Sequence, residues 1–99
     1  MSDLTGRQRR YLRMLGQQLD TALHVGREGV TDAVVRQTDA HLDAHELIKI
    51  RVSEQAPEGR HDAAALLAAR TRSHLAQVLG RTALLYRARK DEPTIVLPD

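Results

Sequence analysis

The spacing of apolar residues along the chain switches several times between the period of a helix and the alternation of a strand. A helical period places apolar residues three or four apart, and a strand that is buried on one side alternates apolar with polar residues. The predicted elements are a helix over residues 4–16, a strand over 19–25, a helix over 31–45, a strand over 47–52, a helix over 63–73, and strands over 75–79 and 82–89.

Capping residues mark the predicted helix starts. Thr5 followed three residues later by Gln8 fits a capping box. Thr31 is the expected N-cap of the second helix, with Asp32 in the first turn where it complements the helix dipole. Asp62 is the expected cap of the third helix.

The order of elements predicts an α/β (α+β) fold, a compact α-β-α-β-α-β-β domain formed by residues 1–99. Two β-α-β crossovers make the first three strands parallel if they share one sheet, and a turn at Gly80-Arg81 makes the fourth antiparallel. We therefore expect a four-stranded mixed sheet with two helices packed on one face. The tail from about residue 91 is expected to be partly mobile, with a short edge strand over residues 94–97.

Composition limits the kinds of function. The chain has 99 residues, no cysteine, no phenylalanine or tryptophan, and two tyrosines, Tyr11 and Tyr86. Disulfides and thiolate metal sites are thereby excluded, and little base stacking by aromatic residues is expected. No apolar run approaches membrane-spanning length, so we expect a cytoplasmic protein with no membrane partner.

Charge is segregated along the chain. Residues 1–13 carry four arginines against one acid, residues 14–46 carry two against six, and residues 47–99 carry nine basic residues against six acids. This pattern indicates a molecule with one positive side, which is the minimum requirement for a nucleic-acid binder.

Gly26-Arg27-Glu28-Gly29 lies between a predicted strand and a capped helix. Such a loop presents backbone N–H groups, and its glycines let a nucleic-acid backbone approach closely. Arg27 would attract a phosphate, whereas Glu28 would repel one. Strand-to-helix loops also use glycine for backbone reasons alone. The other candidate RNA-binding residues are basic positions on the first helix, on strands and in the hairpin: Arg10, Arg13, Lys49, Arg51, Arg81 and Arg87.

Catalytic and metal-binding patterns are weak. His41 and His45 are spaced to share a metal, but no third ligand with a recognisable spacing follows. Ser53 and Ser73 lie in no nucleophile motif, and no Walker or dinucleotide fingerprint occurs. We expect no enzyme, no metal or other cofactor, and no small-molecule substrate.

Four segments together resemble the CRM domain and its stand-alone bacterial form, the YhbY family. They read LTGRQR at residues 4–9, VGREGVT at 25–31, HELIKI at 45–50 and VLGRTALLYR at 78–87. The resemblance implies the same element order, a fold similar to the C-terminal domain of translation initiation factor three, and RNA binding with the GxxG loop in the contact surface. It also implies association with precursors of the large ribosomal subunit and a role in ribosome assembly.

The resulting hypothesis is a monomer that binds ribosomal RNA mainly through phosphates. The alternative is a protein-interaction module, in which the acidic helix face with Asp32, Asp39 and Asp43 docks on a basic ribosomal protein or assembly factor.

Overall fold

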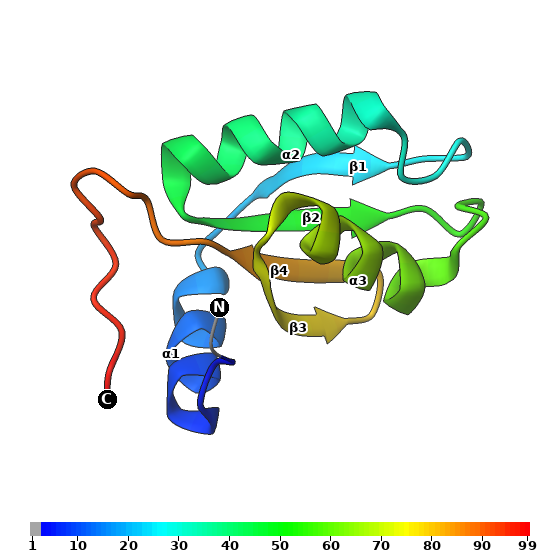
Figure 1. Cartoon of the computed structure of the whole chain (residues 1–99). Coiled ribbons are helices and arrows are strands. Elements are labelled where there is room, and N and C mark those ends of the chain that lie inside the picture. Colours follow the sequence, from blue (N-terminus) through cyan, green and yellow to red (C-terminus); the bar gives the residue numbers. More distant parts are fainter. Residues whose placement is uncertain (1–2) are drawn as a thin grey trace.

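The computed structural model describes residues 3–99 and contains the three helices and four strands predicted within residues 4–89, in the predicted order. Their bounds are α1 Gly6–Gly16, β1 Thr21–Val25, α2 Asp32–His45, β2 Leu47–Val52, α3 Gly59–Thr71, β3 His74–Leu79 and β4 Thr82–Tyr86. The fold class predicted from the sequence is therefore confirmed (Figure 1).

The four strands form one mixed sheet in the order β1-β2-β4-β3. β1 is parallel to β2, and β4 runs antiparallel to both β2 and β3. The first three strands thus point the same way, as predicted, while the hairpin inserts β4 between β2 and β3. As a result β1 is an edge strand, with only β2 beside it in the sheet.

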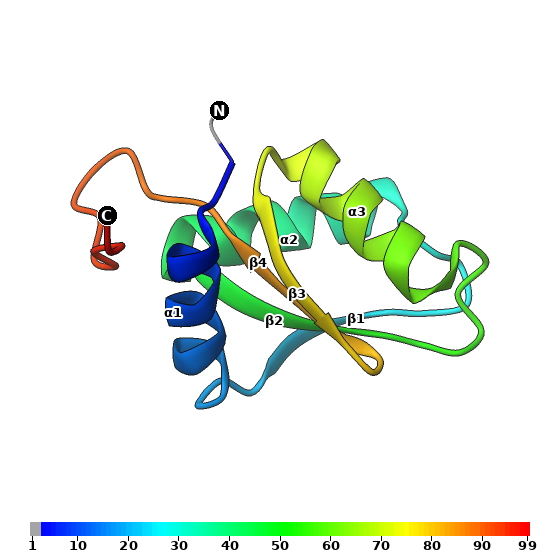
Figure 2. The same cartoon turned by 90° about the horizontal axis from the view of Figure 1, so that it is seen from below.

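The sheet buries both of its faces, but against different partners. α2 and α3 cover one face and enclose the larger cluster, which includes Leu42, Ile50, Leu67 and Leu85. α1 packs on the opposite face, where Leu12 joins a smaller cluster made largely by residues of β2, β3 and β4. Figure 2 shows α2 and α3 together on one side of the sheet, with α1 at one end. Because α1 lies at one end of the sheet, the rest of its face of the sheet remains open (Figure 2).

Two of the three predicted helix starts are correct. The capping box is present, with Gln8 N donating to Thr5 Oγ1 at 3.1 Å and Thr5 N donating to Gln8 Oε1 at 3.0 Å. Thr31 Oγ1 caps α2 by accepting from Val34 N at 3.2 Å. The prediction for α3 is wrong, because that helix begins at Gly59 and Asp62 lies inside its first turn.

Two predictions about the C-terminal part are also wrong. β4 ends at Tyr86 and does not continue to residue 89, so Arg87 and Arg89, which the predicted strand would have placed on one face, lie beyond it. Residues 91–99 contain no strand. Both differences have one cause, since the chain beyond β4 bonds to Glu46 between α2 and β2 instead of to a neighbouring strand. Arg87 N donates to the Glu46 carbonyl at 2.8 Å.

Glu46 holds the C-terminal segment through its buried side chain. Its carboxylate accepts hydrogen bonds from Arg89 N, from Thr94 N and Oγ1, and from Ile95 N, all at 2.8–2.9 Å. Burial would raise the pKa of Glu46, but these donors outweigh burial and lower it to about 2. Beyond this anchor, Ile95 packs against the α1 cluster and Gln8 Nε2 donates to the Pro98 carbonyl at 3.0 Å.

Among residues 3–99, no helix has both the length and the apolar character needed to cross a membrane.

Candidate nucleic-acid interface

The GxxG loop forms a tight turn between β1 and α2. Gly29 N donates to the Gly26 carbonyl at 3.0 Å, and Arg27 and Glu28 lie exposed at the tip. Gly29 has a φ of 77°, a conformation that other residues adopt only with strain. The loop, the segment between β2 and α3, and the β3–β4 hairpin lie at the same end of the molecule, away from α1 (Figure 1).

The second half of this loop is occupied by a carboxylate of the same chain. Glu58 Oε2 accepts a hydrogen bond from Val30 N at 3.0 Å. A Cβ on Gly29 would lie only 2.4 Å from Glu58 Oε1. The fold itself therefore favours glycine at position 29. The N–H of Val30, one of the loop groups expected to bind a phosphate, already donates to Glu58.

The first half of the loop is different. A Cβ on Gly26 would meet no heavy atom within 4 Å among the described residues, and its φ is not in the left-handed region. No contact within residues 3–99 thus explains the glycine at position 26. An incoming backbone finds room on this side of the loop, where a side chain would otherwise stand.

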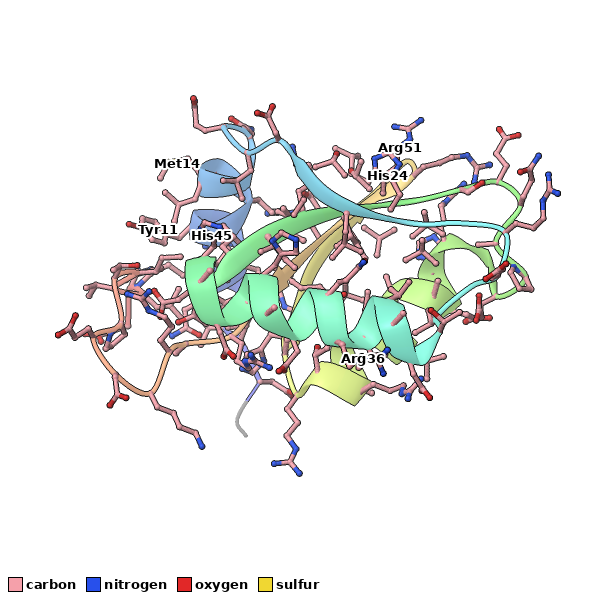
Figure 3. All side chains as sticks on the ribbon, turned by 90° about the horizontal axis from the view of Figure 1, so that it is seen from above. Tyr11, Met14, His24, Arg36, His45 and Arg51 are labelled. Atoms are coloured by element: carbon pink, nitrogen blue, oxygen red, sulfur yellow. The ribbon has the colours of Figure 1, made fainter. Side chains whose placement is uncertain are left out.

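A hollow of about 400 Å³ adjoins Gly26 on the open face of the sheet. His24, Arg51 and Arg81 contribute to its wall. His24 and Arg51 are register partners on β1 and β2, and Figure 3 shows both side chains projecting from the sheet on the side away from α2. Arg81, in the hairpin, lies 3.4 Å from Glu54 Oε1, so its charge is partly compensated.

A second, smaller hollow of about 70 Å³ lies where α1 meets the sheet, and Arg13 and Lys49 line it. Lys49 and Arg51 are two residues apart on β2, so both lie on the face opposite Ile48 and Ile50 of the larger core. The structure thereby brings four of the predicted RNA-binding residues onto one face. We call this the cationic strip: Arg13, Lys49, Arg51 and Arg81, which ends beside Gly26.

Arg10 is exposed on α1, one turn before Arg13, and lines neither hollow of the strip. Arg27 and Glu28 lie at the loop tip, near the end of the strip that adjoins Gly26. Their predicted roles in RNA binding are therefore compatible with an extended surface, but they lie at its margins.

Arg87 does not join the strip. It donates to Asp39 Oδ1 at 2.6 Å, to Asp43 Oδ1 at 2.8 Å and to the Thr71 carbonyl at 2.7 Å. Its side chain is only 20% exposed. The guanidinium ties the end of α3 to the flank of α2, so its hydrogen-bonding groups serve the fold.

These ion pairs also change the acidic helix face. Asp39 and Asp43 share the single positive charge of Arg87, and Asp32 Oδ1 accepts from Arg70 at 2.7 Å. The hydrogen bond and the charge of Arg70 lower the pKa of Asp32 below its ordinary value. Two arginines of the same chain thus pair with the three aspartates, which leaves one of the three negative charges uncompensated for a basic partner.

Sequence reasoning missed two residues of the site. Glu58 lies between two predicted elements, and its contact with the loop, 28 residues earlier in the chain, has no local signal in the sequence. His24 could have been found by alternation, because it lies between the core residues Leu23 and Val25.

His41 and His45 stack on α2 with ring centroids 6.4 Å apart. Within the described part of the chain, no three histidine, aspartate or glutamate side chains gather as metal ligands would.

Comparison with known proteins identifies the family. Residues 4–87 match the family model described as the CRS1 / YhbY (CRM) domain. The chain is 39% identical over 95 residues to the Bacillus subtilis protein YqeI, named a probable RNA-binding protein, and the match covers 96% of this chain and 99% of that one. A Pseudomonas aeruginosa relative, PA4753, also named a probable RNA-binding protein, is 33% identical over 85% of this chain and 81% of its own length. The solution structure of SAV1595 from Staphylococcus aureus matches with a TM-score of 0.82 at 37% identity, covering 96% of this chain and 99% of that one. The chain therefore belongs to the CRS1/YhbY (CRM) domain family.

Proposed function

We propose that this domain binds RNA through its phosphates, using the cationic strip and the Gly26 side of the GxxG loop. The observation that carries the proposal is the alignment of Arg13, Lys49, Arg51 and Arg81 along one open face, with Arg51 and Arg81 at the hollow beside Gly26. The names of the relatives, which describe RNA-binding proteins, support it.

The chemistry of the strip suits phosphate recognition. Arginine presents a planar fork of N–H donors, and lysine a compact positive charge. Because the N–H of Val30 already donates to Glu58, we expect the phosphate to bind near Gly26 and Arg51 and not at the α2 end of the loop. Phosphate contacts fix the position of an RNA but carry no direct sequence information, so the strip alone is expected to bind with low sequence preference.

The biological RNA we propose is ribosomal RNA in precursors of the large subunit. The domain would act in the cytoplasm as a monomer and assist assembly by holding an RNA segment, a binding role rather than a catalytic one. The choice of RNA and the assembly role rest on the family resemblance, because nothing in the strip selects one phosphate backbone over another.

The test is titration of purified protein with large-subunit ribosomal RNA between 50 and 200 mM salt, with transfer RNA as the comparison ligand. If four phosphates are neutralised, affinity should fall by about 50- to 150-fold over this range. A Lys49→Gln, Arg51→Gln variant should bind more weakly at 50 mM salt and lose about half of the salt dependence.

Arg36→Gln is the matched control, since Arg36 is an exposed arginine on α2, away from the strip (Figure 3). Equal binding by wild type and the double variant would remove the strip from the interface. Equal binding of ribosomal and transfer RNA would retain the RNA-binding function but refute ribosomal specificity.

A further inference from the structure

A third hollow, of about 520 Å³, opens beside the cationic strip at the edge of the sheet. Its apolar wall is formed by Leu15, Leu19, Ala22 and Ile95, which come from α1, the α1–β1 linker, β1 and the C-terminal segment. Its volume falls within the range of about 300–1,000 Å³ that is usual for sites that take small organic groups. Because α1, β1, α2, β2 and the C-terminal segment all line it, the hollow is a product of the tertiary fold.

Two imidazole rings stand at this hollow. His41 and His45 lie one turn apart at the C-terminal end of α2, and their rings are inclined by only 22°. His45 is exposed, and Figure 3 shows it at the end of α2 on the same side of the molecule as Tyr11 and Met14 of α1. A pair of nearly parallel rings beside an aliphatic wall offers flat π-surface and apolar contact together.

Lys49 joins this hollow to the cationic strip, because it lines both this hollow and the smaller one that it shares with Arg13. On the opposite side, Ala22 lies at a register shift in the β1–β2 pairing and has no partner residue on β2. β1 is also an edge strand, so peptide groups on its outer side point away from the sheet. The hollow therefore combines an apolar wall, flat rings and nearby backbone hydrogen-bonding groups with two opposite charges, those of Lys49 and Asp20.

We propose that this hollow binds one unpaired base of an RNA whose phosphates lie along the cationic strip. The inference rests on the proposed function and adds a base-binding site to it. The base would lie against the imidazoles and the aliphatic wall, and Lys49 would contact the neighbouring phosphate. The low aromatic content of the sequence predicts little stacking, but that expectation counts only tyrosines, and Tyr86 is indeed buried in the core at 4% exposure. Continuity with the strip through Lys49 favours a nucleobase over a protein side chain as the occupant.

The experiment compares two RNA hairpins that are identical except for one bulged 2-aminopurine, present in the first and absent from the fully paired second. Wild type should bind the bulged hairpin more tightly by about fivefold or more, the size expected for one stacked base. The fluorescence of 2-aminopurine should change on binding, because a stacked base is quenched.

A His41→Ala, His45→Ala variant should lose this preference and the fluorescence change, while keeping its affinity for the paired hairpin. His61→Ala, which removes an exposed histidine from the first turn of α3, is the matched control. A thermal melt by circular dichroism verifies that each variant is folded.

The outcomes separate this inference from the proposed function. Wild-type protein that binds both hairpins equally, or a double-histidine variant that keeps the preference, overturns the base site and leaves the hollow for a protein segment, while phosphate binding stands. Wild-type protein that binds neither hairpin overturns both proposals.

Discussion

Replacing Glu46 with glutamine should weaken the whole domain, although the change leaves the shape of the side chain almost unaltered. The Glu46 carboxylate is fully buried and accepts four hydrogen bonds from residues 89–95. A glutamine has only one acceptor oxygen, and its amide would direct a donor toward another donor. The C-terminal segment, which also covers part of the α1 cluster, should then detach first.

The size of the effect follows from the pKa. The difference between about 2 in the folded protein and the ordinary value of 4.5 corresponds to about 3 kcal/mol. Because folding lowers this pKa, the stabilisation is complete above pH 4.5 and is lost as the pH falls from 4.5 toward 2. We therefore expect Glu46→Gln to cost about 3 kcal/mol of unfolding free energy at pH 7 and much less at pH 2.5. Domains of this kind are stable by roughly 5–15 kcal/mol, so the variant should still fold at neutral pH.

Urea unfolding followed by circular dichroism at pH 7, 4.5, 3.5 and 2.5 measures the difference between wild type and variant directly. Glu28→Gln is the control, because Glu28 is an exposed glutamate at the loop tip. Hydrogen exchange at the amides of Arg89, Thr94 and Ile95 should be faster in Glu46→Gln than in wild type. A difference below about 0.5 kcal/mol at pH 7, or one that stays constant down to pH 2.5, would falsify this account of the buried carboxylate.

Three further substitutions test the division of roles around the loop and α2. Gly29→Ala should destabilise the fold by about 2 kcal/mol or more, because its φ is positive and its Cβ would overlap the Glu58 carboxylate; a wild-type melting temperature would contradict this. Gly26→Ala should change the free energy of unfolding by less than about 0.5 kcal/mol yet lower RNA affinity severalfold, because the new methyl group would contact only a bound RNA. Unchanged RNA affinity would show that the RNA does not contact that side of the loop. Arg87→Ala should lower the free energy of unfolding in urea by only about 1–2 kcal/mol, because its partner Asp39 is half exposed and solvent weakens the ion pair. The same variant should keep its RNA affinity within about twofold of wild type, and a larger loss would show that Arg87 belongs to the interface.

Local patterns in the sequence were enough to predict the order of elements and most of their bounds. Thr5 and Thr31 cap helices through residues three positions away, and the alternation in Leu47–Val52 assigns each side chain to a face of the sheet. Such interactions lie within a few residues of one another, so the sequence displays them directly. The error at α3 arose because Asp62 resembles a cap, whereas the helix begins at Gly59 without any side-chain capping bond.

The site itself depended on contacts that no local pattern displays. The sequence determined that basic residues and two glycines were present, together with the order along the chain of the strands that hold them. Only the tertiary structure decided that Arg13, Lys49, Arg51 and Arg81 share an open face, while Arg87 is used to join α2 to α3. It also decided that Glu58 occupies one half of the GxxG loop and leaves the Gly26 side open. The physical reason is range: capping and alternation act over two to four residues, whereas the charges that compensate or expose a given arginine come from segments that meet only when the sheet and helices pack.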